Sequence, residues 1–236
     1  LLLLHDAGTN GNSFRDVMDR LAVEHSPVSF DLPGHGRSGE LDSLTSIEAM
    51  AVHAENLVGD WGLNSLIVVG EGMGAAVALE LASRAVIKVA GVVCLGAVGR
   101  SVDLSQEISD LALIASGKAR RQFDSTGYAP DTDESVFRKA FAEWVKTDPR
   151  AALGARRAQE MWNAEAEVSH VNTPTLVVIG EETEDQYRQS SERLADELPF
   201  GATRGLDGAA RRGAIENPAE LSLVIDAFSN ELEVTK

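Results

Sequence analysis

Apolar residues along the chain follow two patterns, short continuous runs and stripes with a spacing of three or four. Continuous runs of four to eight apolar residues are typical of strands buried on both faces, and the stripes are typical of amphipathic helices. The runs predict strands at residues 1–5, 65–69, 88–95 and 174–180. A second short strand is expected at residues 27–31, and a last one, with a weaker pattern, at 202–206. The stripes predict helices at residues 13–24, 45–61, 75–84, 184–198 and 217–231.

Alternation of strands and helices predicts an α/β fold with a mostly parallel sheet. The pattern changes between residues 102 and 168, where amphipathic segments at 103–116, 134–146 and 149–162 occur without a strand. We interpret residues 101–168 as a helical cap and residues 1–100 and 169–236 as the core. A pocket under the cap is expected at the carboxyl ends of the strands, where ligands bind in open α/β sheets.

Helix-capping residues predict where two of these helices begin. Thr45 with Glu48 three positions later has the form of a capping box. Asn217 before Pro218 has the form of an N-cap followed by a proline at the first helical position.

Residues 66–74 read L-I-V-V-G-E-G-M-G and combine a short apolar run, a glycine-rich turn and the start of a helical stretch. Strand, sharp turn and helix are the context of the G-x-S-x-G nucleophile elbow. Gly70 and Gly74 would permit the tight turn and close helix packing. Gly72 stands where the nucleophile is expected, and it has no side chain.

Other segments extend this similarity along the chain: L-L-H-D-A-G at 3–8, D-L-P-G-H-G-R-S at 31–38, P-T-L-V-V-I-G at 174–180, and L-D-G-A-A-R at 206–211 with E-N-P at 216–218. In this order and spacing the chain resembles the α/β-hydrolase family over essentially its whole length. With G-Y-A-P at 127–130 and T-D-P at 147–149, it is most similar to 3-oxoadipate enol-lactonases and haloperoxidase-like esterases. The resemblance implies an α/β-hydrolase fold, a mostly parallel sheet flanked by helices and covered by a helical cap.

The resemblance also implies positions for a serine, a histidine and an acid, the triad of this family. The serine position is Gly72, the acid position is Thr183 and the histidine position is Arg211. Glycine cannot attack a carbonyl, and arginine remains protonated and cannot act as a base near neutral pH. The triad is therefore expected to be degenerate, although Glu182 and Glu184 beside Thr183 leave room for a shifted carboxylate.

By resemblance, the oxyanion-binding amides would be those of Ala7 and Met73, because backbone donors do not depend on side-chain identity. Asp6 and Glu71 add carboxylates near the expected pocket, opposite Arg211. Arg211 would either close the pocket by an ion pair with Glu71 or a nearby Glu, or bind a carboxylate-bearing ligand together with the two amides.

Three functions follow from these residues. The first is a non-hydrolytic pseudoenzyme that binds a small, carboxylate-bearing molecule or a partner. The second is an esterase, a lactonase or a lyase that uses Glu71, Asp6 or Glu182 as a base, with burial raising its pKa. The third is a structural or dimerisation role with the cap as the interface. Whether the chain is an enzyme is left open, and we predict no cofactor and no metal site.

Composition limits which partners the protein is expected to bind and in which compartment it is expected to lie. A net charge of -16 argues against nucleic acid and anionic membranes as partners. The single cysteine, Cys94, lies in an apolar run, which predicts a buried structural thiol and a reducing, cytoplasmic compartment. We expect structural roles for His5 and His35, and a surface or interhelical position for His53.

The chain begins without Met and inside an apolar run, so we expect further residues upstream. In the family that the chain resembles, one or two strands precede the first strand seen here. Such strands would cover the edge formed by residues 27–31.

Overall fold

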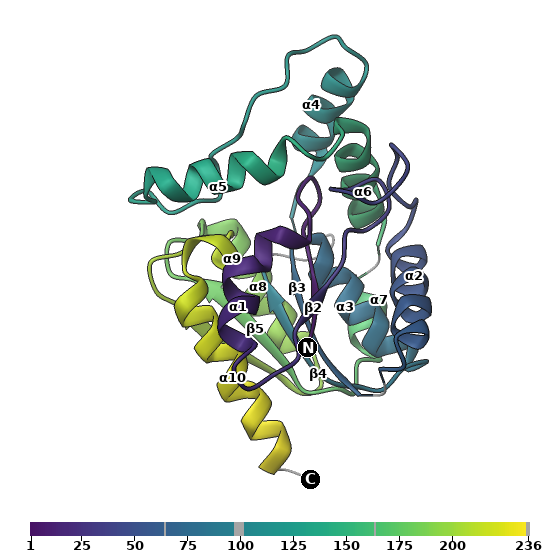
Figure 1. Cartoon of the computed structure of the whole chain (residues 1–236), viewed down its shortest axis with the longest axis vertical. Coiled ribbons are helices and arrows are strands. Elements are labelled where there is room, and N and C mark those ends of the chain that lie inside the picture. Colours follow the sequence, from purple (N-terminus) through teal and green to yellow (C-terminus); the bar gives the residue numbers. More distant parts are fainter. Residues whose placement is uncertain (64, 97–101, 163, 235–236) are drawn as a thin grey trace.

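A computed structural model of the chain describes residues 1–63, 65–96, 102–162 and 164–234. Its centre is a parallel six-stranded sheet with the order β2-β1-β3-β4-β5-β6 (Figure 1). The strands are β1 (Leu2–Leu4), β2 (Val28–Ser29), β3 (Leu66–Glu71), β4 (Val89–Leu95), β5 (Thr175–Gly180) and β6 (Gly201–Leu206). The predicted parallel sheet is therefore confirmed.

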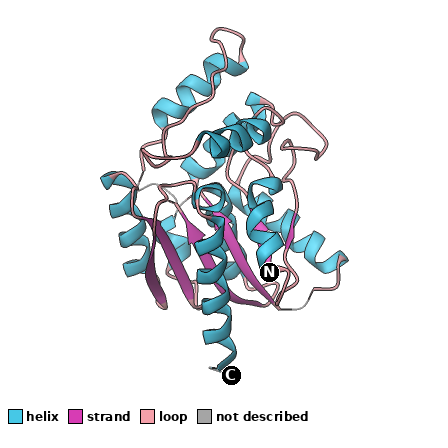
Figure 2. Cartoon of the chain, turned by 60° about the vertical axis from the view of Figure 1, so that its left-hand side comes forward, coloured by secondary structure: helices cyan, strands magenta, loops and turns pink. Residues whose placement is uncertain are grey.

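Helices cover both faces of the sheet (Figure 2). One face packs against α2 (Ile47–Asp60), α3 (Met73–Arg84), α7 (Ala164–Val168) and α8 (Asp185–Glu197). The other face packs against α1 (Arg15–Leu21), which follows the 3-10 helix η1 (Gly11–Phe14), and against α10 (Pro218–Val234). Alternate residues of β1 enter opposite cores, since Leu2 and Leu4 belong to the first cluster and Leu3 to the second. Burial on both faces explains the continuous apolar runs.

Three further helices, α4 (Ser105–Ala115), α5 (Glu134–Trp144) and α6 (Pro149–Met161), lie above the carboxyl ends of the strands (Figure 1). They follow β4 in the chain and precede β5, as the predicted cap does. The short helix α7, inside the predicted cap, packs into the core through Val168. The boundary at residue 101 lies outside the described residues, and the division into core and cap stays a prediction. No described helix is both long and apolar enough to cross a bilayer.

Two predicted boundaries differ from the structure. Ser46, and not Thr45, caps α2: its backbone is extended, and its hydroxyl accepts a hydrogen bond from Ala49 N at 3.1 Å. The second strand has only two residues, and two positions beyond it the carboxylate of Asp31 accepts hydrogen bonds from the amides of Gly11 and Arg37.

Other local predictions are confirmed. Asn217 Oδ1 accepts a hydrogen bond from Glu220 N at 3.2 Å, as an N-cap does. The weakly patterned last strand, β6, pairs with β5 along all six of its residues. Cys94 is buried in the core, and burial raises the pKa of its thiol to about 12. A short helix, α9 (Gly213–Glu216), precedes α10 and was not predicted.

Candidate functional site

The turn between β3 and α3 has the predicted elbow geometry. Gly72 has φ 55° and ψ -116°, a conformation that side-chain-bearing residues adopt only under strain. A Cβ at Gly74 would lie 2.1 Å from Leu4 O, so this glycine lets α3 approach β1 closely. The elbow therefore exists as a backbone feature, with Met73 as the first residue of the helix.

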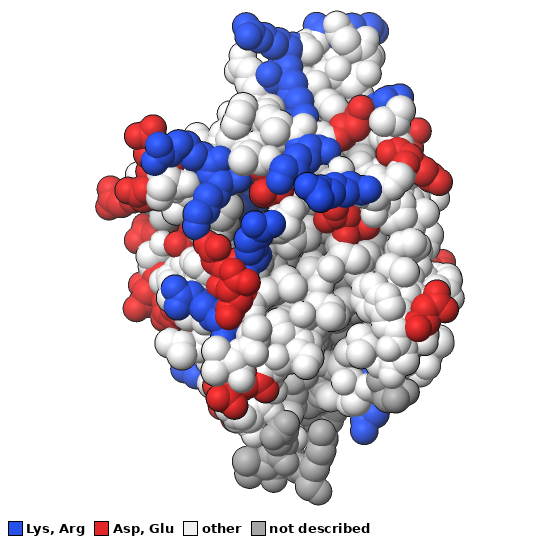
Figure 3. Space-filling view, in the orientation of Figure 1, with Lys and Arg blue, Asp and Glu red and all other residues white. Residues whose placement is uncertain are grey.

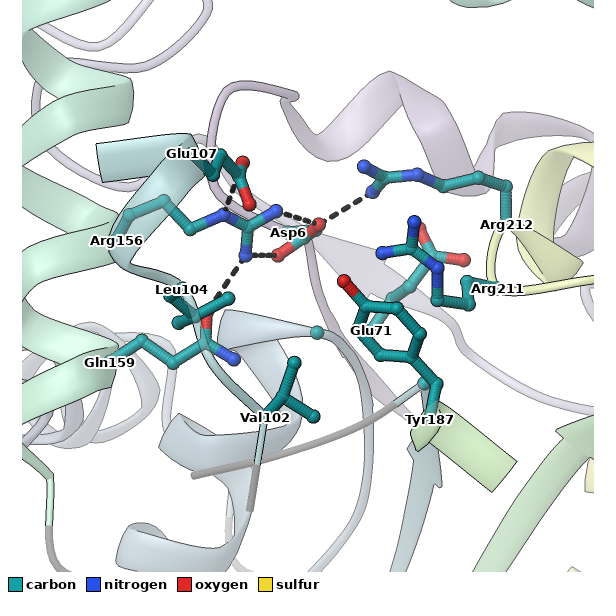
Figure 4. Close-up of a pocket in the computed structure, with 12 residues that line it drawn as sticks. Asp6, Glu71, Val102, Leu104, Glu107, Arg156, Gln159, Tyr187, Arg211 and Arg212 are labelled. Carbon is teal, nitrogen blue, oxygen red and sulfur yellow. Dashed lines mark hydrogen bonds and ion pairs between the residues drawn. The ribbon is translucent and has the colours of Figure 1, made fainter. Parts of the chain in front are cut away.

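The carboxylate of Asp6, two residues after β1, lies against this turn and at the centre of the site in Figure 4. Its Oδ1 accepts hydrogen bonds from Ala7 N at 2.7 Å and Met73 N at 2.9 Å. Arg156 donates from Nη1 to Oδ1 at 2.7 Å and from Nη2 to Oδ2 at 2.8 Å, and Arg212 Nη1 donates to Oδ2 at 2.5 Å. The two amides named from the resemblance thus converge on one oxygen, which belongs to the protein's own carboxylate.

Asp6 also fills the room that a side chain at position 72 would need. A Cβ on Gly72 would lie 2.2 Å from Asp6 Oδ1 and 2.4 Å from its Cγ. Such distances are far below van der Waals contact, so a serine at position 72 and Asp6 in this position exclude each other.

Asp6 is only 3% exposed, yet it stays ionised. Burial alone would raise the pKa of its carboxyl, but attraction to Arg156 and Arg212, with the hydrogen bonds that it accepts, holds the pKa well below its usual range. A carboxylate with so low a pKa is a poor general base. Of the three candidate bases, Asp6 is thus unsuited on electrostatic grounds.

Glu71, the last residue of β3, has a different environment. It is 2% exposed, and its Oε1 accepts one hydrogen bond, from Ala214 N at 3.3 Å. Burial raises the pKa of Glu71 to about 7, although nearby Arg212 opposes this shift. Glu182, the third candidate base, is exposed and does not line the pocket. Glu71 is therefore the candidate whose pKa suits acid–base chemistry near neutral pH.

Arg211 lies at the rim of the pocket. It forms an ion pair with Glu184, with Nε 3.1 Å from Oε2, and its guanidinium stacks over the ring of Tyr187 at 3.8 Å. Of the two partners predicted for Arg211, a nearby Glu is the one found, and Glu71 is not. The ion pair that fills the centre of the site is that of Asp6 with Arg156 and Arg212, which the sequence analysis did not identify.

Thr183, at the predicted acid position, is buried beyond the end of β5, and its amide donates to Gly180 O at 3.1 Å. It does not line the pocket, whereas its neighbour Glu184 reaches the rim through Arg211. The two predicted structural histidines, His5 and His35, are fully buried, and their ring centroids lie 4.9 Å apart. His53 is half-buried on α2 beside Phe30.

Arg156 carried a signal that could have revealed it. It lies on the face of α6 that is buried, among the small residues Ala152, Ala155 and Ala158. A charged residue on a buried helix face requires a buried partner of opposite charge. Arg212 carried no such signal, because nothing in an Arg-Arg pair tells which guanidinium turns inward.

The pocket itself is small, with a cavity volume of about 30 Å³, room for little more than a water molecule. Arg212 and Gln159 line it, and the described residues accept no hydrogen bond from Arg212 Nε, Arg212 Nη2 or Gln159 Nε2. Within the described ranges, no cluster of His, Cys, Asp or Glu could hold a metal ion. The pocket therefore offers spare hydrogen-bond donors and one carboxylate with a raised pKa.

Over 99 residues the chain is 32% identical to the dihydrolipoyllysine-residue acetyltransferase component of the acetoin cleaving system of Cupriavidus necator, a match that covers 42% of this chain and 26% of that protein. The chain thus spans about a quarter of the length of this curated relative, and a match to the 30 kDa magnesium-chelatase subunit of Rhodobacter capsulatus covers 29% of that protein.

Solved structures match nearly the whole chain. MenH from S. aureus has a TM-score of 0.80 with 17% identity, over 98% of this chain and 93% of that one. The enol-lactonase from Burkholderia xenovorans has a TM-score of 0.77 with 16% identity, over 97% and 90% of the two chains. At these identities the likeness concerns the fold alone. A model of the alpha/beta hydrolase family matches residues 1–222, and with the parallel sheet and the elbow this shows that the chain belongs to the alpha/beta hydrolase family.

Proposed function

We propose that this protein is a non-hydrolytic member of its family, a pseudoenzyme that binds a small carboxylate-bearing molecule in the pocket under the cap helices. The observation that carries the proposal is the carboxylate of Asp6 on the amides of Ala7 and Met73. In a serine hydrolase, amides in this position stabilise the oxyanion of the tetrahedral intermediate. Here an anion already occupies them.

The triad positions support the same conclusion. Gly72 supplies no nucleophile, Arg211 no base and Thr183 no carboxylate, as argued from their residue types. Loss of a whole triad costs a serine hydrolase about a factor of 10⁶ in rate, and the remainder depends largely on the oxyanion hole. With that hole occupied by Asp6, the remainder is lost as well.

The spare donors support an anionic ligand. Arg212 donates to Asp6 through Nη1 only, so its Nε and Nη2 can donate two parallel hydrogen bonds to a planar carboxylate. Gln159, which lies across Asp6 from Arg212 in Figure 4, also lines the pocket and carries an amide donor. The cavity has a volume of only about 30 Å³, so we propose that the cap helices shift to admit the ligand.

The proposal is tested with activated esters and with carboxylates. We expect p-nitrophenyl acetate and an enol-lactone to be hydrolysed no faster with the protein than in buffer. A screen of small carboxylates by thermal shift is expected to find a ligand whose effect is lost in Arg212→Gln and kept in Arg84→Gln, an arginine that pairs with Glu55 away from the pocket. Ester turnover that a pocket substitution abolishes would contradict the proposal.

The pKa of Glu71 favours a second candidate, an esterase, lactonase or lyase that uses this carboxylate as a base without a serine nucleophile. Such an enzyme has a rate that rises with pH through about 7 as Glu71 loses its proton. In Glu71→Gln that rise would disappear. An unchanged pH profile in Glu71→Gln removes this candidate.

We propose that the protein lies in the cytoplasm, that it binds neither nucleic acid nor membranes, and that it self-associates. The buried Cys94 thiol and the net charge of -16 support these proposals. Light scattering tests self-association, with a variant of exposed Phe141 on α5 to test the cap as the interface.

A further inference from the structure

Four separate segments deliver hydrogen-bond donors to the carboxylate of Asp6. Ala7 N comes from the loop after β1, Met73 N from the first residue of α3, Arg156 from α6 and Arg212 from the residue before α9. Together they make five contacts of 2.5 to 2.9 Å with the two oxygens. Two positive charges and the amino end of a 12-residue helix surround this one negative charge.

We infer that these donors form a binding site for a free carboxylate, and that Asp6 is its built-in ligand. We call the donors, Ala7 N, Met73 N, the Arg156 guanidinium and Arg212 Nη1, the carboxylate cradle. A chain that lacks the Asp6 side chain binds a small free monocarboxylate such as formate in the cradle. This inference does not depend on whether the protein hydrolyses esters.

The cradle is held in place by groups other than Asp6. Arg156 donates from Nε to Glu107 Oε1 at 2.8 Å and from Nη1 to Gln159 Oε1 at 2.7 Å. The backbone amide of Arg212 donates to Glu216 Oε2 at 3.1 Å. The amides of Ala7 and Met73 belong to the main chain of the β1 loop and of α3. Removal of the Asp6 side chain therefore leaves the donors pointing at the vacated position.

The geometry favours a planar carboxylate over other anions. Arg156 donates from Nη1 and Nη2 to two different oxygens at 2.7 and 2.8 Å, the parallel arrangement that matches a carboxylate. A spherical halide can satisfy only part of this set. The adjoining cavity of about 30 Å³ leaves no room for a large anion. In the native chain the tethered Asp6 carboxylate has a high effective concentration, so free formate does not compete with it.

The test uses the full chain with Asp6→Gly, which empties the cradle, and Asp6→Asn, which removes the charge but leaves the cradle filled. Thermal unfolding is followed while sodium formate is titrated at constant ionic strength against sodium chloride. At about ten times its Kd, formate is expected to raise the Tm of Asp6→Gly by about 3 to 6 °C. The native chain and Asp6→Asn, whose cradle is filled, are expected to show a much smaller shift at the same formate concentrations.

The controls separate the cradle from general anion effects. Asp6→Gly combined with Arg156→Gln loses the formate effect, because the bidentate donor is gone. If formate shifts Asp6→Gly and Asp6→Asn equally, the anion only screens two uncompensated arginines and the inference is wrong.

A failure to fold is also informative. Asp6→Ala replaces Asp6→Gly if the latter does not fold, and refolding of either variant by formate supports the cradle. If neither variant binds formate or folds in its presence, the inference is overturned.

Discussion

Glu71 and Asp6 lie in one pocket, but their environments move their pKa values in opposite directions. Asp6 accepts hydrogen bonds from two arginines, whereas Glu71 accepts one from a backbone amide and has Asp6 as a negative neighbour. Burial penalises both carboxylates, and only Asp6 has enough positive partners to offset it. Two carboxylates in one site therefore carry different charges near neutral pH.

At the residue scale, this arrangement predicts how Glu71 changes stability with pH. The pKa of Glu71 is near 4.5 in the unfolded chain and about 7 in the folded protein. Between these values the folded state binds more protons, so the free energy of unfolding falls as pH rises through this window. The loss attributable to Glu71 is about 3 kcal/mol.

Urea unfolding of the native chain and of Glu71→Gln between pH 4.5 and 8 measures this effect. The difference between the two proteins is the quantity to follow, because burial also lowers the pKa of His5 and of His35, the latter to about 3. Neutral buried histidines add stability as pH rises, but they do so in both proteins. If the difference in free energy of unfolding between the two proteins does not change with pH across this range, Glu71 has the same pKa in the folded protein as in the unfolded chain.

At the scale of elements, the β3–α3 turn and the end of β1 depend on each other. Asp6 can occupy the amides only because Gly72 lacks a Cβ. Gly72→Ser is expected to destabilise the fold by about 3 kcal/mol, since it adds backbone strain at positive φ and expels a buried carboxylate. Adding Asp6→Gly to Gly72→Ser makes room for the serine.

A double-mutant cycle measures this dependence by urea unfolding of the four proteins. We expect the double variant to be about 1 to 3 kcal/mol more stable than the sum of the two single substitutions predicts. Neither protein that carries Gly72→Ser should gain esterase activity, because no histidine lies at position 211. Strictly additive effects would mean that Asp6 and a side chain at position 72 do not compete for the same room.

Glu216 joins the loop before α5 to the loop before α9. Its Oε1 accepts hydrogen bonds from Ala129 N at 2.6 Å and Thr132 Oγ1 at 2.9 Å, and its Oε2 accepts from Ala210 N and Arg212 N. This one carboxylate thus holds the loop 129–132 against the segment that carries Arg212.

Glu216→Gln is expected to lower stability by about 2 to 3 kcal/mol, because charge-assisted hydrogen bonds are replaced by weaker ones and an amide NH₂ faces a donor. Hydrogen exchange should accelerate at residues 127–132. The matched control is Glu220→Gln. Glu220 lies on α10, and its carboxylate accepts a hydrogen bond from Asp207 N. If both variants change exchange at 127–132 alike, Glu216 has no special role in holding this loop.

Sequence patterns predicted the elements far better than the centre of the site. Buried strands and the glycine spacing at positions 70, 72 and 74 are local signals, and they located the sheet and the elbow. The contact between Asp6 and Arg156 joins residues 150 positions apart, so no local pattern encodes it. Ser46 and Thr45 show the same limit at small scale, because two adjacent residues can both cap a helix and only packing selects one.

At the scale of the whole molecule, charge is distributed unevenly. The chain has a net charge of -16, yet residues 105–162, which include α4 to α6, contain nine Lys and Arg and nine Asp and Glu. In Figure 3 the basic side chains gather mostly over the part of the molecule where these helices lie. Residues 105–162 therefore carry no net charge in a strongly acidic chain, so on average they repel an anionic ligand less than the rest of the chain does.

Two contacts hold α6, which carries part of the pocket lining, against the core. Arg156 on α6 pairs with Asp6, and the hydroxyl of Thr147, just before α6, donates to Thr9 O at 3.0 Å. A Cβ at Gly154 on α6 would lie 3.3 Å from Ser43 Cβ in the loop before α2. Disulfide-bonded cysteines have Cβ atoms about 3.5 to 4.5 Å apart, so this pair can be cross-linked after a small adjustment.

We predict that Ser43→Cys with Gly154→Cys forms a disulfide that holds α6 closed. It closes a loop of about 110 residues, and we expect about 2 to 4 kcal/mol of stabilisation, or about 5 to 10 °C in Tm, relative to the same protein with reductant. Cys94 does not interfere, because it is buried and burial raises its thiol pKa to about 12. If ligands enter only when α6 moves, the oxidised protein also loses the ligand-dependent thermal shift and regains it on reduction. A cross-linked protein that still binds ligand at the native rate would place the entrance elsewhere than under α6.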